Sequence, residues 1–101
     1  MTSSTTPRFE PGEIRATPGS LHTLQAAHQT ATQLLARHLS GDWGTLSESD
    51  KAANDAALTD GGRILSAYQL PSGETLWIIT EALGDDGRRE ATTLLRPDGA
   101  L

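Results

Sequence analysis

Three residues that offer a base, an acid and an aromatic ring stand close together in the chain, His38, Asp42 and Trp43. We expect a helix to end just before Asp42, and the dipole of a helix C-terminus favours the protonated form of a nearby histidine. Such a histidine can act as a general acid or base. The alternative is a structural His38 that caps the last carbonyls of the helix, with Asp42 bracing the turn. Trp43 is then a plug between helix and sheet.

A metal site at this position is not predicted. His38 and Asp42 are four residues apart, but Gly41 lies between them and is expected to end the helix. The chain has no cysteine, no HExxH motif and no glycine-rich phosphate loop followed by lysine. We therefore expect no metal and no cofactor, and we exclude disulfides and thiolate catalysis.

A β-hairpin over residues 63–82 is the element around which the chain is organised, because β-branched and aromatic residues are dense only there. The runs 63–70 and 75–82 flank a Pro-Ser-Gly-Glu turn. A two-residue loop at Ser72 and Gly73 places Tyr68 opposite Trp77. The aliphatic face that takes the helices is then Leu65, Ala67, Leu76 and Ile78. The opposite face carries Ser66, Tyr68, Trp77 and Glu81.

Two sets of candidate site residues follow from this register. As a surface that binds a protein, the candidates are Trp43, Ser66, Tyr68, Trp77 and Glu81. As a catalytic face, the candidates are His38, Arg63 and Glu81, with Ser66, Tyr68 and Thr92 beside them. The third interpretation is a half-wetted sheet surface without a site.

The N-terminal half of the chain predicts an arm, a short strand and helices. Residues 1–11 are rich in Ser, Thr and Pro and are expected to form a disordered arm, with residues 12–101 forming one domain. A short strand is expected at residues 13–16. Thr17 and Pro18 are typical of a helix start. Thr30 either caps a second helix or lies within one long helix over residues 18–39.

The remaining elements complete an α+β fold. Ser47 caps an expected helix over residues 48–58, which has acids in its first turn. A turn follows residue 82, and residues 91–95 read as a third strand. We therefore predict two or three N-terminal helices packed on one face of a three-stranded antiparallel meander, either alone or with an extra N-terminal strand.

The charge of the chain limits its partners. The formal net charge is −5, so nucleic acid is a poor default ligand and a protein partner or a homodimer is expected. No apolar run is long enough to span a membrane, and the N-terminus lacks the apolar segment of a signal peptide. These features are typical of a cytoplasmic protein.

Several blocks of the sequence resemble a family of short proteins encoded by bacteria, phages and plasmids, labelled as plasmid-related or as type I restriction subunits. The similar blocks are Thr17-Pro18-Gly19, Arg37-His38, Ser40-Gly41-Asp42-Trp43-Gly44, Asp50-Lys51, Asn54-Asp55, Gly62-Arg63-Ile64-Leu65-Ser66-Ala67-Tyr68, Trp77-Ile78-Ile79-Thr80-Glu81-Ala82 and Thr92-Thr93-Leu94-Leu95. The segment between Ala82 and Thr92 is longer here than in the family. The resemblance implies no catalytic residues, and no methyltransferase cofactor motif is present.

Two functions from different classes remain. The first is an acidic accessory module of a mobile element or phage that docks on a protein partner. The alternative is a small ribonuclease of the RelE/ParE or barnase-like toxin type, an analogy that rests on the order of the elements alone. A basic sheet face would favour the nuclease, whereas an acidic or apolar face would favour docking.

Overall fold

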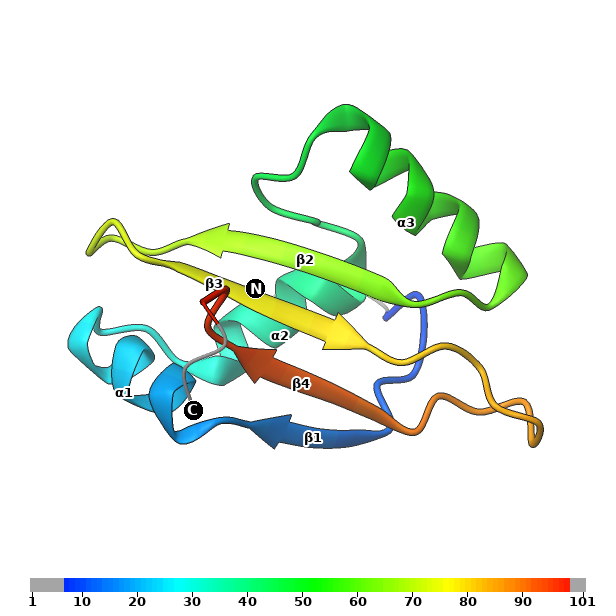
Figure 1. Cartoon of the computed structure of the whole chain (residues 1–101), viewed down its shortest axis with the longest axis horizontal. Coiled ribbons are helices and arrows are strands. Elements are labelled where there is room, and N and C mark those ends of the chain that lie inside the picture. Colours follow the sequence, from blue (N-terminus) through cyan, green and yellow to red (C-terminus); the bar gives the residue numbers. More distant parts are fainter. Residues whose placement is uncertain (1–6, 99–101) are drawn as a thin grey trace, which may run out of the picture.

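The computed structural model describes residues 7–98, which form a mixed sheet of four strands accompanied by three helices (Figure 1). The elements are β1 (Glu13–Ala16), α1 (Pro18–Ala26), α2 (Ala31–Ser40), α3 (Glu48–Asp60), β2 (Ile64–Gln69), β3 (Thr75–Thr80) and β4 (Ala91–Leu95). Within this part of the chain, no helix is long and apolar enough to cross a lipid bilayer.

The strands lie in the order β1-β4-β3-β2. β2, β3 and β4 are antiparallel neighbours, whereas β1 pairs with β4 in parallel, from Glu13 beside Ala91 to Ala16 beside Leu94. The α+β class is confirmed. The predicted three-stranded meander forms part of a four-stranded mixed sheet, in which β1 is the additional strand. A parallel neighbour requires a long crossover, and the whole stretch from α1 to β3 lies between β1 and β4 in the chain.

The two N-terminal helices are separate. The Thr17 side chain accepts a hydrogen bond from the Ser20 N–H at the start of α1. Thr30 and Gln33 form a capping box at the start of α2, and His28 between the helices adopts a left-handed φ of 56°. A continuous helix cannot contain that backbone conformation, so the chain forms two helices rather than one.

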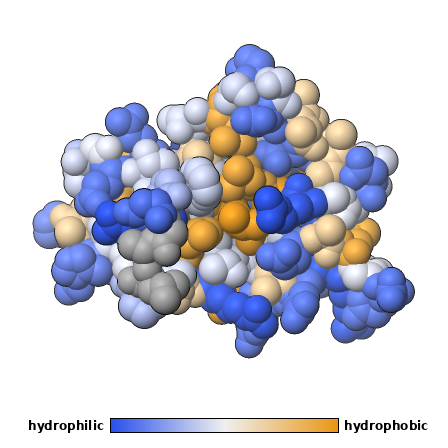
Figure 2. Space-filling model, in the orientation of Figure 1, coloured by the Kyte–Doolittle hydropathy of each residue, from blue (hydrophilic) through white to orange (hydrophobic). Residues whose placement is uncertain are grey.

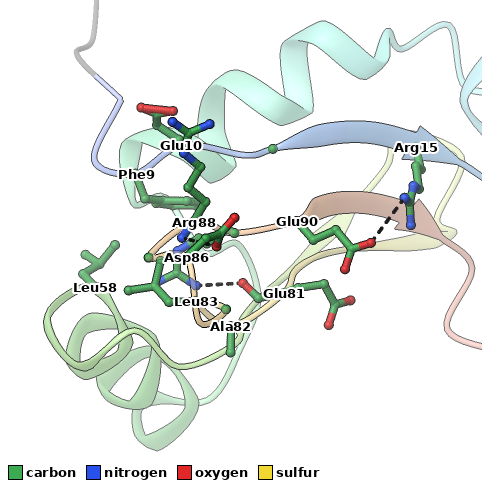
Figure 3. Close-up of a pocket in the computed structure, with 14 residues that line it drawn as sticks. Phe9, Glu10, Arg15, Leu58, Glu81, Ala82, Leu83, Asp86, Arg88 and Glu90 are labelled. Atoms are coloured by element: carbon green, nitrogen blue, oxygen red, sulfur yellow. Dashed lines mark hydrogen bonds and ion pairs between the residues drawn. The ribbon is translucent and has the colours of Figure 1, made fainter.

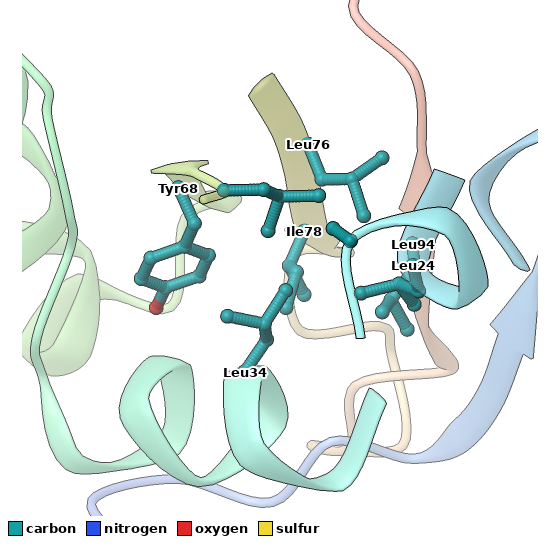
Figure 4. Packing of buried hydrophobic residues seen from close by; sticks show 8 residues of the cluster. Leu24, Leu34, Tyr68, Leu76, Ile78 and Leu94 are labelled. Carbon is teal, nitrogen blue, oxygen red and sulfur yellow. The ribbon is translucent and has the colours of Figure 1, made fainter. Parts of the chain in front are cut away.

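The main core lies between the sheet and the helices α1 and α2. Figure 4 shows Leu24 of α1 and Leu34 of α2 facing Leu76 and Ile78 of β3. Leu94 of β4 closes the cluster, and Ile78, Leu76 and Leu94 have no exposed surface. Burial of apolar area stabilises a fold by about 25 cal/mol per Å². This cluster is the larger of the two in the core, so it contributes the larger part of that stabilisation.

The loop of the β2–β3 hairpin has three residues, Pro71 to Gly73, rather than the predicted two. The Leu70 N–H donates to the Glu74 carbonyl at 2.7 Å, and the Gly73 N–H donates to the Leu70 carbonyl at 2.8 Å. Gly73 adopts a φ of 91°, which glycine tolerates because it has no Cβ. The additional loop residue shifts the pairing by one position.

This shift exchanges the two faces of β2, so the predicted faces of β2 are wrong. Tyr68 pairs with Leu76 and Ser66 with Ile78. Successive side chains of a strand point to opposite faces, and Ser66 and Tyr68 therefore enter the core, where neither is exposed. Leu65 turns to the face away from α1 and α2. The prediction that the helices cover Leu76 and Ile78 is confirmed.

The N-terminal segment that the structure describes is not a free arm. The Arg8 N–H donates to the Leu39 carbonyl at 2.8 Å, and the Phe9 ring meets the His38 ring edge-on at 5.3 Å between centroids. The Pro11 carbonyl accepts a hydrogen bond from Thr92. The prediction of disorder is therefore wrong for residues 7–11, and its remaining part lies outside the described residues.

α3 lies along the outer edge of β2 and helps to close that edge (Figure 1). The Asn54 side-chain amide donates to the Leu65 carbonyl at 2.6 Å and accepts from the Leu65 N–H at 3.1 Å. The backbone of Ala67 pairs with Trp43 and Thr45. An edge strand with free backbone N–H and carbonyl groups is a template for aggregation. These contacts occupy the backbone groups of Leu65 and Ala67 and so leave fewer of them free on β2.

The two adjacent isoleucines of β3 test the register, because Ile78 faces the core and Ile79 faces away. We expect Ile78→Asp to lower the free energy of unfolding by more than about 4 kcal/mol and abolish folding, since it buries an unpaired carboxylate. The matched variant Ile79→Asp should remain folded, with a loss of about 1–2 kcal/mol. Circular dichroism during urea unfolding measures both. Equal losses would contradict the register.

The packing of Phe9 leads to a second prediction. Phe9→Ala should lower the free energy of unfolding by about 2 kcal/mol, because the half-buried ring contacts His38, Trp43 and Arg89. Glu10→Ala, which changes the exposed neighbour, is the control and should cost less than about 0.5 kcal/mol. Thermal and urea unfolding provide the comparison, and equal stabilities for both variants would mean that the segment does not contribute.

Candidate functional site

A chain of buried hydroxyl and imidazole groups runs through the core. His38 Nδ1 lies 2.6 Å from Ser66 Oγ, and His38 Nε2 lies 2.8 Å from Thr80 Oγ1. Thr80 Oγ1 lies 2.7 Å from Thr92 Oγ1, which donates to the Pro11 carbonyl at 2.8 Å. The four side chains are fully buried. The chain connects α2, three strands and the N-terminal segment.

The direction of each hydrogen bond follows from its last member, because a carbonyl can only accept. Thr92 uses its hydrogen on Pro11, so Thr80 must donate to Thr92 and accept from His38. His38 therefore carries its hydrogen on Nε2. A neutral ring then offers Nδ1 as an acceptor, and Ser66 donates to it. The arrangement satisfies neutral His38 completely.

The environment of His38 opposes its protonation. Burial, followed by the charge of Arg89, lowers the pKa of His38 from 6.5 to about 4. The ring is enclosed by Phe9 and Trp43, with 5.3 Å and 6.0 Å between centroids. His38 is thus a neutral core residue at pH 7, and the two expected alternatives, a protonated side chain and a cap on carbonyls, do not describe it.

The residues that follow α2 hold the turn together. Arg37 Nε donates to Asp42 at 2.7 Å, and this bond is the main cause of the lowered pKa of Asp42. The Tyr68 hydroxyl donates to the Asp42 carbonyl at 2.6 Å, and burial raises the Tyr68 pKa. Trp43 is 4% exposed and donates to Asp55. These contacts are structural, and the interpretation of Trp43 as a core plug fits its position.

A hollow lies beside the 81–90 segment (Figure 3), and the buried Arg89 is among the residues that line it. Arg89 donates to the carbonyls of Gly62, Glu81 and Ala57 at 2.7, 2.9 and 3.1 Å. Its guanidinium lies 5.6 Å from the centre of the Phe9 ring, and burial lowers its pKa. Ala57 belongs to the last turn of α3, where a cation is favoured by the helix dipole. Arg89 therefore anchors the loop to the helix.

The rim of the hollow carries exposed charges. Arg15 Nη2 lies 2.6 Å from a Glu13 carboxylate oxygen and 3.9 Å from a Glu90 oxygen, and Glu81 adds to the negative field around it. The described residues that line the hollow include no His, Ser, Thr, Tyr, Cys or Lys. The polar side chains of this lining are therefore carboxylates and guanidinium groups.

The sheet face opposite α1 and α2 is the candidate functional site. Its half-buried residues are Leu65, Trp77, Ile79, Thr93 and Leu95, which we call the open face. Figure 2 shows apolar residues gathered in the middle of the molecule on the side where Figure 1 shows the sheet uncovered by α1 and α2. Hydrophilic residues surround this apolar centre. Apolar patches with a polar rim are common at the interaction surfaces of proteins, which makes this face the candidate site.

The register shows how the open face is arranged. Leu65, Ile79 and Thr93 form one row across three strands, and Ala67, Trp77 and Leu95 form the next. Arg63 and Glu81, both exposed, directly follow the last β2–β3 pair and begin a charged row beyond the first. Gln69 and Thr75 end the apolar part on the other side. Two apolar rows thus lie between a charged row and a polar row.

The predicted site residues are divided between the open face and the interior. Trp77 is half-buried on the open face, and Arg63 and Glu81 are exposed at its end. His38, Trp43, Ser66 and Tyr68 lie in the interior, so the expectation that Ser66 and Tyr68 lie on the exposed face is wrong. The pairing that would have joined Tyr68 to Trp77 is also absent.

The sequence predicted Trp77 as a site residue but not its three apolar neighbours on the open face, which are Leu65, Ile79 and Leu95. The turn could have placed Leu65 on the correct face. A three-residue loop that ends with a left-handed Gly73 is a common hairpin type, and it gives the observed register. The role of Arg89 had no local signal, since its three acceptors are 8 to 32 residues away in the chain.

Comparisons with family models, with curated proteins and with solved structures found no match to this chain. Among residues 7–98, no group of three or more His, Cys, Asp or Glu side chains is placed to hold a metal ion. The interpretation of the site therefore depends on its geometry.

The buried His38 predicts a pH dependence of stability. The unfolded chain binds a proton at His38 near pH 6.5, whereas the folded chain does so only near pH 4, so stability is greatest above 6.5 and is lost as the pH falls toward 4. We expect a loss of about 2–3 kcal/mol from this residue between pH 7 and pH 4.5.

Urea unfolding at several pH values measures this loss. His38→Gln should be less stable than the parent at pH 7 but should lose less stability on acidification, because it cannot bind the proton. His22→Gln, at an exposed histidine, is the control and should follow the parent. A parent whose stability changes between pH 7 and 4.5 no more than that of His38→Gln would contradict the buried neutral imidazole.

Proposed function

We propose that this protein is a small acidic binding module that docks on a protein partner through the open face. The observation that carries the proposal is the half-buried Trp77, with Leu65, Ile79 and Leu95 around it, on a sheet face that α1 and α2 leave uncovered. Tryptophan surrounded by aliphatic side chains is enriched among the residues that dominate binding energy.

The resemblance to plasmid and phage proteins extends this proposal to the origin of the partner. A mobile element benefits from small proteins that act on host or competing phage proteins, and such an accessory role requires a docking surface rather than an active site. We propose a cytoplasmic location for this encounter, consistent with the absence of cysteine from the chain.

The small-ribonuclease alternative has less support. His38, its expected base, is buried, neutral and hydrogen-bonded on both ring nitrogens. Arg63 and Glu81 are exposed at the end of the open face, whereas His38 is bonded to Ser66 and Thr80 on the core face of the sheet. The centre of the face is apolar rather than basic, which favours docking over the binding of a polyanion.

The proposal is tested with the partner itself. The tagged protein is used to isolate its partner from the cells that encode it, and the purified pair is studied by calorimetry. We expect Trp77→Ala to weaken the affinity more than about tenfold while lowering the free energy of unfolding by only about 1–2 kcal/mol. Leu21→Ala, at a leucine of α1 that is 50% exposed, is the control.

The control should leave the affinity within about twofold of the parent, because an isolated exposed leucine contributes little to either property. Unchanged affinity of Trp77→Ala for the purified partner would exclude the open face as the docking surface. A Trp77→Ala protein that fails to fold would instead identify Trp77 as a core residue. The affinity of Thr93→Ala, a milder change on the same face, would then be compared with that of the parent.

A further inference from the structure

The net charge of the chain is concentrated in two segments that border the open face. Residues 48–60, which form α3, carry four carboxylates against one lysine, and residues 81–90 carry four carboxylates against two arginines. These segments together account for the whole formal charge of −5, and the remainder of the chain is balanced. One of the two arginines, Arg89, is buried and bound to carbonyls, so it does little to neutralise the surface.

Both segments are held at the border of the open face by specific contacts. Asn54 of α3 binds the backbone of Leu65 on β2. The 81–90 segment connects β3 to β4, and the Glu81 N–H donates to the Ala91 carbonyl at 3.0 Å. An approaching partner therefore meets the carboxylates of α3 along the β2 edge and those of the 81–90 segment at one end of the strands, where Arg15 and Arg63 are also exposed.

The size of the apolar centre suits a helix. It extends across β2, β3 and β4, and two gaps between strands of about 4.8 Å each make it about 10 Å wide. A helix with its side chains is about 10 Å in diameter. The opposite face of the same sheet is already covered by α1 and α2, and a helix on the open face would complete a three-layer arrangement.

We propose that the open face receives an amphipathic helix of a partner protein, with Lys or Arg beside its apolar stripe. This inference rests on the proposed docking function and adds the chemistry of the partner. The apolar stripe covers Trp77 and Ile79, and the basic side chains reach the carboxylates of α3 and of the 81–90 segment. Charge complementarity of this kind steers association and selects the partner.

A second copy of this chain is a poorer occupant. A symmetric dimer through the open face uses the same patch on both copies, so the bordering acidic segments of both copies meet at one interface. The like charges of these segments oppose each other, whereas a basic helix is attracted by them.

The probe is a synthetic amphipathic peptide of about 18 residues, long enough to form a helix alone, with leucine on one face and lysine on the other. Its twin carries glutamate in place of each lysine. Fluorescence anisotropy at about 0.1 M salt compares their binding to the full chain. We expect the lysine peptide to bind at least about tenfold more tightly than the glutamate peptide.

Two pairs of variants locate the binding. Glu81→Lys, at the end of the open face, should weaken binding of the lysine peptide about fivefold. Glu74→Lys makes the same charge change at the exposed β2–β3 turn and should weaken it less than about twofold. Trp77→Ala should also weaken binding, whereas Leu21→Ala should not.

The possible outcomes separate this inference from the proposed function. If both peptides bound equally and Trp77→Ala abolished this binding, the inference that the partner is basic would be overturned. The open face would still be supported as a docking surface. Binding of the lysine peptide that Trp77→Ala leaves unchanged would indicate attraction to acidic surface only and would overturn the inference. Self-association of the parent in sedimentation equilibrium, abolished by Trp77→Ala, would replace the helix by a second copy.

Discussion

The buried hydrogen-bond chain through His38 is the interaction on which the rest of the structure depends. A single imidazole joins α2 to Ser66 of β2 and Thr80 of β3, and Thr92 continues the chain to the carbonyl of Pro11. Buried polar groups are costly when any one of them lacks a partner. The chain therefore favours one register of the strands and one position of the helix, because other arrangements leave buried hydroxyls unsatisfied.

This requirement explains why the two faces of the sheet differ so strongly. The face toward α1 and α2 holds Ser66, Thr80 and Thr92 beside Ile78 and Leu94, and these residues are fully buried. Most of their alternate neighbours on the same strands are half-buried, among them Leu65, Trp77, Ile79 and Leu95, whereas the small Ala67 and Ala91 are buried. The buried Ser and Thr hydroxyls of the sheet thus belong to the internal network, while Leu65, Trp77, Ile79 and Leu95 give the open face its mainly apolar character.

Arg89, which contacts the same Phe9 ring as His38, has a corresponding role at the end of α3. Its guanidinium binds the carbonyls of Ala57 and Gly62, at and just beyond the end of α3, and the carbonyl of Glu81 after β3, and it lies against Phe9. An arginine can serve several carbonyls at once because it has five donors in a fixed geometry. The contact fixes the acidic 81–90 segment relative to α3, so the two acidic borders of the open face are positioned by one side chain.

Local sequence signals determined the elements of this protein, whereas only the tertiary structure decided its faces and its site. Thr17, Thr30 and Ser47 mark helix starts because their side chains bond to backbone N–H groups within three residues. The face of β2 depended on one additional loop residue at Gly73, and a shift of one position exchanges the inward and outward side chains. The partners of His38 are 28 and 42 residues away in sequence, and contacts over such separations leave no local pattern.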